Sequence, residues 1–537
     1  MIKKGESNLN QPWHNSYPNG IHRQIDIPSI SLFEILERTV EDYPTNKAII
    51  DGDKELNYVQ LKEKCERLAA ALYQRGFRKG DRIALMLPNS MEYVISYYAI
   101  HRLGGVVVQV NPMYQPSELD YILQDSEAIL LICRQEQKQK LEQTAMADKL
   151  TIIFADEDDR LENSLYYWIE KGNTELPALD VNPKEDIAVL QYTGGTTGRS
   201  KGVMLTHSNL FSVLYQSFVF QGGVRQPNNS NIGLPPLIHV MGMSRLNANV
   251  FNGQTFVCVA RFDVNRLLEL IRKHRPTMLP AVPTILIGLL NHPDLDPEDL
   301  DCIKNCVSGS APLPVEVANE FEQRTGVKIL EGYGLSETPV SHLSPAGRSK
   351  RGSIGIPIPN TDCKIVDMET GLRELPLNES GELLIKGPQV MKGYWKNPEE
   401  TELAIKDGWF YTGDIATMDE EGYFYIVGRK KDIIIAGGYN IYPVEVEEVI
   451  YQHPDVSEVC VFGIPDSYRG ETVKAVIVLK ESVCTTEENI ENWCTERLAR
   501  YKVPRLIEFR SEIPKTHVGK TLRRALVEDE KRKTDIS

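Results

Sequence analysis

The sequence predicts an α/β protein with a large N-terminal domain of layered subdomains, a small β subdomain, and a smaller α+β domain at the C-terminus. Three observations predict this class. The chain has 537 residues, more than a single hydrophobic core usually organises. Segments of helical and strand-like periodicity alternate along most of it, as in layered α/β folds. Short strands replace this alternation near residue 363, and the pattern changes again after residue 430.

The first segments show the alternation. Apolar residues at helical or strand spacing predict a helix over 31–43 (SLFEILERTVEDY), a short strand over 47–52 (KAIIDG), a helix over 57–76 that ends at Gly76, and a strand and turn over 81–90. The most apolar stretch, YVISYYAIHRLGGVVVQVN, is interrupted by His101, Arg102 and two glycines. A membrane-spanning helix is therefore not expected there.

Two further units follow. The short strands CKIVD, GELLIKG and GYFYIVG, separated by turn residues, predict a small β subdomain over about 363–427. Beyond it, PVEVEEVIYQH predicts a helix, and VSEVCVFGI and VKAVIVLK predict strands. Residues 489–502 predict a second helix with one apolar face, formed by Ile490, Trp493, Leu498 and Tyr501. We therefore expect an N-terminal domain over 1–430 and a C-terminal domain over 431–537.

The composition of the chain disfavours several classes of protein. The 75 acidic residues outnumber the 60 basic ones, and the net charge of −15 disfavours a nucleic-acid partner and generic binding to anionic lipid. The nine cysteines are scattered, and Cys302 and Cys306 lack the second pair that a zinc site needs. Buried free thiols are the better interpretation, and they suit a reducing compartment. Because no apolar segment follows the first basic residues, we expect a cytoplasmic protein without a secretory signal.

The stretch TGGTTGRSKG, residues 193–202, lies between the predicted strands DIAVLQY and VML. Its glycines let backbone N–H groups surround an oxygen anion, and its hydroxyl side chains and Lys201 add donors and charge. This combination predicts a polyphosphate cradle, with a flexible solvent loop as the alternative. The stretch does not match the P-loop pattern G-x-x-x-x-G-K-[ST]. Ser208 is expected to cap the helix that follows.

The stretch LEGYGLSETP carries a second group of candidates. Gly332 and Gly334 permit a tight turn, Tyr333 offers a flat face to a base, and Glu337 offers a ligand to a divalent cation. Further along, Asp414 and Arg429 are candidates to bracket a ribose; a β-turn aspartate and a surface arginine are the alternatives.

Cations gather in the C-terminal part. Arg429, Lys430 and Lys431 precede an apolar strand, and this cluster is either a solvated boundary or a hinge that carries catalytic charge. Lys520 lies in PKTHVGK, within residues 499–524, where eight Lys and Arg face two Asp and Glu. This local reversal of charge suits a polyanionic ligand, and a charged helix face is the alternative.

The motifs resemble, in order, the core motifs of the adenylate-forming superfamily of acyl-CoA synthetases, luciferases and peptide synthetase adenylation domains. They are YTGGTTGRSKGVMLTH, EGYGLSET, YTGD, GRKKDIIIAGGYNIYPVEVEEV and PKTHVGK, and they span nearly the whole chain. Within the superfamily the chain is most similar to bacterial long-chain fatty-acid–CoA ligases, on segments that include KGPQVMKGYWKNPEET, IPDSYRGETVKAVIVLK and YKVPRLIEF.

The resemblance implies an ATP-dependent, AMP-forming ligase that joins a fatty acid, long-chain by overall similarity, to coenzyme A. The carboxylate attacks the α-phosphorus of ATP to give an acyl-adenylate and pyrophosphate, and the CoA thiol then displaces AMP. Catalysis of this kind rests on positioning and charge neutralisation. ATP and coenzyme A are the implied co-substrates, Mg²⁺ is the implied metal, and the apolar substrate implies weak peripheral contact with the inner face of the membrane.

The resemblance also implies roles for single residues. Lys520 would bridge the acyl carboxylate and the α-phosphate, and Glu337 and Thr193 would hold Mg²⁺. His239 would lie beside the reacting carboxylate, with a satisfied buried histidine as the alternative. The hinge of a rotating C-terminal domain falls on Lys431. The implied nucleotide-binding residues are Thr193, Gly194, Gly195, Thr196, Thr197, Gly198, Ser200, Lys201, Gly309, Ser310, Ala311, Tyr333, Gly334, Asp414 and Arg429.

Two positions depart from the family pattern. Ile435 stands where many relatives have a lysine, and Ile238 stands where they often have an aromatic residue, which leaves the second step and the shape of the acyl pocket open. Three rivals stay in view: a related ligase for short-chain, medium-chain or aromatic acids, a kinase-like ATPase that releases ADP, and a non-catalytic acyl-binding protein.

Overall fold

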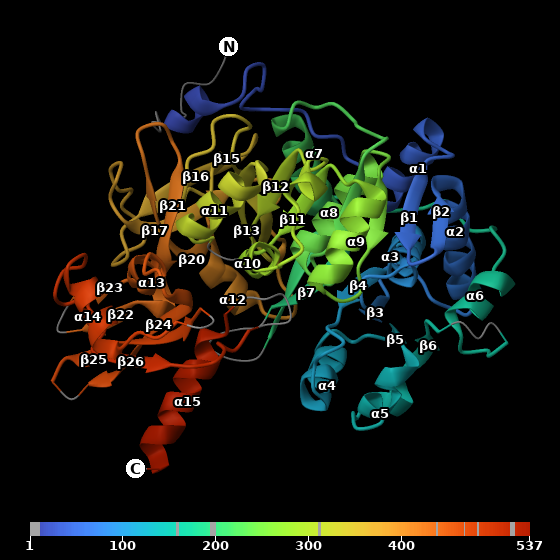
Figure 1. Cartoon of the computed structure of the whole chain (residues 1–537). Coiled ribbons are helices and arrows are strands. Elements are labelled where there is room, and N and C mark those ends of the chain that lie inside the picture. The colour runs from blue at the N-terminus through green and yellow to red at the C-terminus, as the bar shows by residue number, and fades with distance from the viewer. Residues whose placement is uncertain are drawn as a thin grey trace.

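The computed structural model describes residues 11–156, 160–193, 200–309, 313–436, 439–466, 468–480, 483–515 and 521–536. The expected α/β class is confirmed: mixed sheets with helices on their faces make up the large N-terminal part, and a small α+β unit follows at the C-terminus. In Figure 1 the orange and red elements of this last unit gather at one side of the blue, green and yellow ones.

The largest sheet contains β1 (Lys47–Asp51), β2 (Lys54–Asn57), β9 (Ser230–Gly233), β10 (Thr255–Cys258), β11 (Met278–Ala281), β12 (Asn305–Ser308), β13 (Ile329–Leu335), β14 (Thr338–Leu343) and β15 (Ile356–Pro357). Its order over the described chain is β15-β14-β13-β12-β11-β9-β10-β1-β2. The inner strands from β13 to β1 run parallel, and the remaining ones pair antiparallel. The carboxyl ends of the parallel strands therefore share one edge.

A second sheet contains β3 (Arg82–Met86), β4 (Val106–Gln109), β5 (Leu130–Cys133), β6 (Thr151–Phe154), β7 (Ile187–Thr193), β8 (Lys201–Thr206) and β18 (Gly393–Tyr394). Its order is β18-β8-β7-β4-β3-β5-β6, and β8 is antiparallel to both of its neighbours, β18 and β7, while the other pairs are parallel. Strands β7 and β8 enclose the glycine-rich loop, so the sheet holds the two ends of that loop side by side.

Two smaller sheets complete the molecule, the first antiparallel and the second mixed, since β26 pairs parallel with β25. The expected β subdomain contains β16 (Asp362–Val366), β17 (Gly381–Lys386), β19 (Ile405–Lys406), β20 (Trp409–Met418) and β21 (Phe424–Arg429). The C-terminal sheet contains β22 (Ile434–Ala436), β23 (Tyr439–Ile441), β24 (Val456–Asp466), β25 (Gly470–Leu479) and β26 (Leu506–Phe509). The domain boundary between residues 430 and 431 stays a prediction.

The helices form layers around the two large sheets. The α-helices are α1 (Leu32–Asp42), α2 (Tyr58–Gln74), α3 (Met91–Leu103), α4 (Pro116–Asp125), α5 (Lys138–Leu141), α6 (Leu165–Lys171), α7 (His207–Phe220), α8 (Val240–Phe251), α9 (Val264–His274), α10 (Pro283–Leu290), α11 (Val315–Thr325), α12 (Pro398–Ala404), α13 (Pro443–Tyr451), α14 (Glu487–Thr495) and α15 (Arg523–Ile536). Helices α1, α2, α3, α7 and α8 share one core with strands of both sheets, α9 to α11 cover the far face of the nine-stranded sheet, and α4 and α5 cover the far face of the other.

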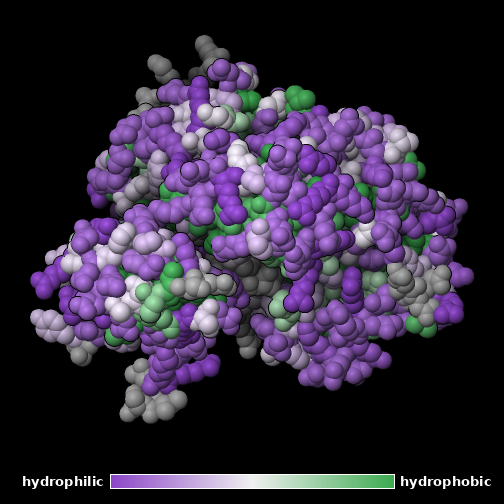
Figure 2. All heavy atoms as spheres, viewed as in Figure 1, coloured by the Kyte–Doolittle hydropathy of each residue, from purple (hydrophilic) through white to green (hydrophobic). Residues whose placement is uncertain are grey.

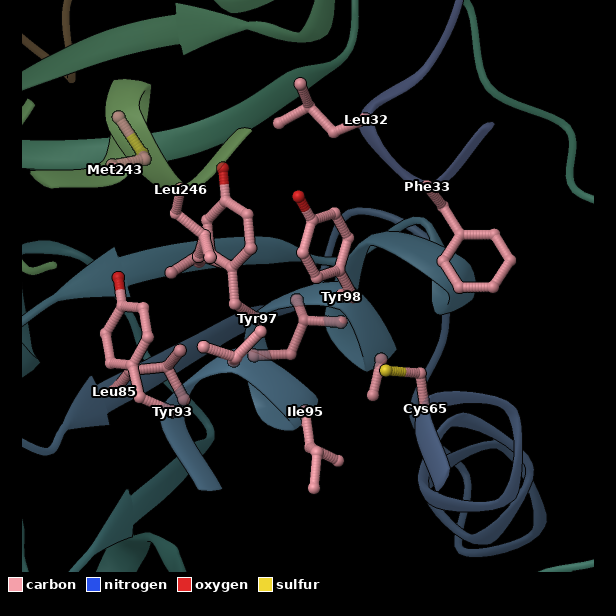
Figure 3. Packing of buried hydrophobic residues seen from close by; sticks show 14 of the residues in the cluster. Leu32, Phe33, Cys65, Leu85, Tyr93, Ile95, Tyr97, Tyr98, Met243 and Leu246 are labelled. Carbon is pink, nitrogen blue, oxygen red and sulfur yellow. The ribbon is translucent and has the colours of Figure 1, made fainter. Parts of the chain in front are cut away.

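The shared core is built on three tyrosines of α3. Tyr93, Tyr97 and Tyr98 are fully buried, and Figure 3 shows them beside Met243 and Leu246 of α8. The Tyr98 hydroxyl donates to Asn247 Oδ1 over 2.9 Å, and Asn247 Nδ2 donates to the Tyr97 hydroxyl over 3.0 Å. One amide thus satisfies two buried hydroxyls and fixes the position of α8 against α3.

Two local expectations are wrong. Thr206, and not Ser208, caps α7: its side chain accepts from Asn209 N, and the Asn209 side chain accepts from Thr206 N, which satisfies two donors at once. The helix expected over 489–502 ends at Thr495. The Thr495 hydroxyl donates a hydrogen bond to the Glu491 carbonyl, and such side-chain bonds to the backbone weaken a regular helix. Leu498 and Tyr501 still pack on the C-terminal core, because the turn carries them to it.

Cysteine and surface properties mostly follow the expectations where they are described. All nine cysteines are free thiols, and seven of them, Cys306 included, are buried as expected; Cys302 is partly buried, and Cys484 is exposed, against the expectation. None of the helices in the described ranges combines the length and apolar content that crossing a lipid bilayer requires. Figure 2 shows a mostly hydrophilic face with hydrophobic residues in small, separate groups.

The Asn247 bridge predicts a stability change. Asn247→Ala leaves two buried hydroxyls without their partner and opens a small cavity, so we expect a loss of about 2–5 kcal/mol in unfolding free energy. Thermal and urea unfolding measure it. The control is Asn252→Ala, which removes one amide bond, to the Ala248 carbonyl, from a partly exposed site. Equal losses in the two variants would show that the bridge has no special role.

Candidate functional site

The candidate site lies where the parallel strands of the nine-stranded sheet end. Gly309 follows β12 directly, and Ser308 pairs with Glu331, so Gly332 and Tyr333 of β13 reach the same edge. Helix α8 begins at this edge after β9, with His239 as its N-cap. Open parallel sheets bind ligands outside the carboxyl ends of their strands. The fold therefore brings Gly309, Tyr333 and His239, which are far apart in sequence, to one edge.

The glycines of LEGYGLSETP do not form the expected tight turn. They lie inside β13, and the turn to β14 is made by Ser336 and Glu337. A Cβ on Gly334 would lie 2.0 Å from the Pro339 carbonyl oxygen, and one on Gly332 would lie 2.8 Å from Leu343 Cδ2. The glycines are needed because β14 packs too closely for a side chain at either position.

Tyr333, Asp414 and Arg429 form a connected group. Asp414 and Arg429 are directly opposite each other on β20 and β21, and Arg429 Nε lies 2.8 Å from Asp414 Oδ1. The Tyr333 hydroxyl donates to Asp414 Oδ2 over 2.6 Å. The alternative of a β-turn aspartate is wrong, because Asp414 lies within a strand and is only 2% exposed. Arg429 keeps 35% of its side chain exposed, but it is paired with Asp414.

Burial shapes the chemistry of this group. Burial disfavours the charged form of Arg429, but the nearby acidic groups, Asp414 foremost, together outweigh this effect, and the pKa of Arg429 lies above its ordinary value. Burial and then the Asp414 charge raise the pKa of Tyr333, which keeps the phenol a donor. Although Arg429 Nε is near Asp414 Oδ1, no donor among the residues that the structure describes is aligned with this buried oxygen in a hydrogen bond. Asp414 Oδ1 therefore has the capacity to accept a hydrogen bond from a ligand.

Glu337 is tied to the glycine-rich loop through Tyr394. The Tyr394 hydroxyl donates to Glu337 Oε1 over 2.8 Å, and Tyr394 pairs with Val203 across β18 and β8. Lys201 Nζ lies 5.1 Å from the centre of the Tyr394 ring and 2.5 Å from Glu400 Oε2. Burial raises the pKa of Glu337, and the bond from Tyr394 works against that rise.

Tyr394 and Glu400 were missed by the sequence analysis. Both lie in KGPQVMKGYWKNPEET, a segment that supported the resemblance without any role for its residues. Their partners are about 57 and 199 positions away. Nothing in the local pattern predicts such pairing. The one available signal is that this segment matches the family without having been given a function.

The structure describes the two ends of the glycine-rich loop. Thr193 ends β7 and pairs with Lys201 at the start of β8. The Ser200 hydroxyl donates to the Thr193 carbonyl, and the Tyr121 hydroxyl donates to the Ser200 carbonyl over 2.9 Å. Ser200 thus closes the neck of the loop. The candidates that lie outside the described residues are Gly194, Gly195, Thr196, Thr197, Gly198, Ser310, Ala311 and Lys520.

The basic junction is paired with acidic groups. Lys430 Nζ lies 3.0 Å from the buried Glu382 carboxylate, and Lys431 lies in a 3-10 turn, η5 (Lys430–Asp432). Burial and then the Arg429 charge lower the pKa of Lys431. Arg429 and Lys430 therefore have acidic partners on the β subdomain, and the choice between a solvated boundary and a hinge stays a prediction.

The two departures from the family pattern differ in exposure. Ile435, in β22, is 55% exposed, an unusual position for a large aliphatic side chain. Ile238 is buried, and its carbonyl accepts from Gln191 Nε2 over 3.0 Å. Ile238 therefore sits in the protein interior next to His239.

The comparisons with known proteins cover the whole chain. Residues 36–395 match the model of the AMP-binding enzyme family, and residues 445–520 match that of the AMP-binding enzyme C-terminal domain. A long-chain-fatty-acid–CoA ligase of Bacillus subtilis is 44% identical over 97% of this chain and 98% of its own length, and one of Escherichia coli O6:H1 is 36% identical over 98% and 100%. The crystal structure of ATP-bound MatB from Rhodopseudomonas palustris is 33% identical, with a TM-score of 0.87 over 94% of this chain and 99% of that one. The chain belongs to the AMP-binding enzyme family.

Proposed function

We propose that the protein is an ATP-dependent, AMP-forming ligase that joins a fatty acid to coenzyme A through an acyl-adenylate. Two relatives that match nearly the whole chain are long-chain-fatty-acid–CoA ligases. The observation that carries the proposal is the group of Tyr333, Asp414 and Arg429 at the carboxyl edge, beside the neck of a glycine-rich loop. A nucleotide and a polyphosphate fit these two features.

The nucleotide would be held mainly through Asp414. Its buried Oδ1 is suited to accept from a ribose hydroxyl, while the ion pair with Arg429 holds the carboxylate in place. The Tyr333 ring would lie along the base, because its hydroxyl is already fixed on Asp414. Because Tyr333 and Arg429 already hold the Asp414 carboxylate, this carboxylate would bind the ribose without having to change its position.

The residues present fit a magnesium ion that bridges protein and phosphate. Glu337 uses Oε1 to bind Tyr394 and has Oε2 for a cation, and Thr193 ends β7 at the loop neck. No group of three or more His, Cys, Asp or Glu in the described part of the chain forms a closed metal cage. Mg²⁺ commonly binds one or two protein ligands together with substrate phosphates. When bound there, it would neutralise phosphate charge that repels the incoming carboxylate.

Lys201 would take part through exchange of partners. In this structure Lys201 is paired with Glu400, so a phosphate must replace the Glu400 carboxylate before it can interact with the Lys201 charge. The pair has 28% and 42% exposed side chains, and exposed pairs of this kind are weak, about 0–1 kcal/mol. Replacement of Glu400 by a phosphate therefore costs little free energy.

The remaining roles rest on position in the chain. His239 would flank the reacting carboxylate at the edge of the sheet, and Lys520 would bridge it to the α-phosphate. A domain that begins at residue 431 would carry Lys520 in and out between the two half-reactions. Long-chain preference and weak contact with a membrane surface belong to the same proposal, since long acids partition into bilayers.

The first prediction concerns products. Purified protein with ATP, Mg²⁺, coenzyme A and a fatty-acid series should release AMP and pyrophosphate and form acyl-CoA. Lys520→Ala should slow adenylate formation by about 10²–10³-fold, as loss of one transition-state donor does. AMP formation only with short or aromatic acids would keep the mechanism and reject the long-chain substrate, and ADP formation or no turnover would reject the mechanism.

The second prediction concerns pH. Glu337 must be ionised to hold a cation, and its raised pKa places the loss of kcat/KM at a higher pH than an exposed glutamate would. Tyr394→Phe removes a bond that favours the carboxylate, so the acidic limb of the profile should move to still higher pH. The control is Tyr192→Phe, which removes a similar tyrosine–carboxylate bond, to Asp125, outside the site. A shift as large in the control, or none in Tyr394→Phe, would refute the role of Glu337.

The third prediction concerns the hinge. Proline at position 431 fixes φ and restricts the residue before it, so Lys431→Pro should slow thioester formation more than adenylate formation. Rapid-quench assays of the two half-reactions measure this difference. Lys431→Ala, which keeps backbone freedom, separates the effect of the backbone from that of the charge. Equal losses in both half-reactions would argue against a hinge at this residue.

A further inference from the structure

Arg245 of α8 has no acidic partner. Its Nη1 lies 3.2 Å from the Met278 sulfur, and within the described ranges its guanidinium forms no other hydrogen bond and no ion pair. Two other arginines of the chain, by contrast, have acidic partners: Arg225 lies 2.6 Å from Asp42, and Arg523 contacts both Asp432 and Glu447. Five N–H donors with a thioether as their one acceptor are far from satisfied.

This guanidinium is partly buried. Desolvation lowers the pKa of Arg245 to about 10, which still leaves it charged at neutral pH. A partly desolvated charge without an acidic partner is unfavourable, and proteins usually pair it or expose it fully to water. An arginine in this environment indicates an anionic partner that the described chain does not supply.

The side chain keeps some accessible surface along one stripe of α8. Met241, Ser244, Arg245 and Ala248, at helical spacing, are partly exposed. The opposite face, which includes Met243, Leu246 and Asn247, is buried. Ser244 Oγ, next to Arg245, is also a buried atom with no hydrogen-bond partner. Two polar side chains of the stripe thus have unused donors.

The stripe leads inward from the reaction edge. Arg245 is six residues after His239, about 9 Å along a helix with a rise of 1.5 Å per residue. Met278, which it contacts, is three residues before the last residue of β11, Ala281, or about 10 Å below the edge at 3.3 Å per residue. Helix and sheet give the same depth for Arg245, so an extended ligand about 10 Å long that begins at His239 and lies along α8 would reach Arg245.

We infer that Arg245 binds a second carboxylate of the acyl substrate, so that the enzyme takes straight-chain dicarboxylic acids. The inference rests on the proposed function and names its substrate class. A guanidinium binds a carboxylate through two parallel hydrogen bonds, which would satisfy the donors that the chain leaves unused. One carboxylate becomes the thioester with release of AMP and pyrophosphate, and the other stays ionised on Arg245 and leaves with the product.

The test compares matched acids on matched variants. kcat/KM is measured for monocarboxylic and α,ω-dicarboxylic acids of equal length, in a series of lengths, with wild-type protein, Arg245→Met, Arg245→Lys and the control Arg225→Met. For the preferred diacid, Arg245→Met should lose roughly 10-fold to 100-fold, the value of a hydrogen bond to a charged group. Its activity on monoacids should stay level or rise, Arg245→Lys should be intermediate, and Arg225→Met should leave the ratio of the two activities unchanged.

Two further measurements exclude a general effect on the fold. Arg245→Met should melt at or above the wild-type temperature, because it removes an unpaired, partly buried charge without a large change in volume. With wild-type protein, the diacid should raise the melting temperature more than the matched monoacid does.

The outcomes separate this inference from the proposed function. An unchanged ratio of diacid to monoacid activity in Arg245→Met, or turnover of monoacids with none of any diacid, would overturn the role of Arg245 and keep the ligase. A melting temperature well below that of wild type would show that Arg245 is structural. AMP formation with neither class of acid would overturn both proposals.

Discussion

The hydrogen bond from Tyr333 to Asp414 joins the two parts of the N-terminal domain at the site. Tyr333 belongs to β13 of the nine-stranded sheet, and Asp414 belongs to β20 of the β subdomain, 81 residues later. With Arg429 on the paired strand, one buried carboxylate is held from two directions. The distance between the sheet edge and the subdomain is thus fixed by a charged group, and hydrogen bonds to charged groups are stronger than neutral ones.

A second tyrosine makes the corresponding connection to the other large sheet. Tyr394 pairs with β8 through its backbone and with Glu337 through its hydroxyl. Glu337 and the loop neck are therefore linked even though they belong to different sheets. The two tyrosines together hold three structural units around one edge, and each of them leaves a carboxylate oxygen that a ligand is able to use.

Much of the fold follows from local sequence patterns, and the site follows only in part. Apolar periodicity predicts α1, α2 and the strands of the β subdomain because those segments bury one face. The predicted N-cap of α7 was wrong. Capping depends on which side chain reaches a free backbone N–H, and Thr206 does so in place of Ser208. Gly332 and Gly334 have the composition of a turn but are required by the close approach of β14, which is a tertiary contact. Tyr394 and Glu400 act through distant partners, so no local pattern indicates them.

Arg245 differs from the charged residues at the site edge. Three of those have partners within the chain: Arg429 has Asp414, Lys430 has Glu382 and Lys201 has Glu400. A ligand that meets one of these cations must share or displace a carboxylate, which reduces the net gain from the interaction. Arg245 requires no such displacement, since no carboxylate in the described part of the chain is paired with its guanidinium. Its interaction with an anion would therefore be opposed by no competing ion pair, and a residue of this kind discriminates between substrates more sharply than the paired cations at the edge do.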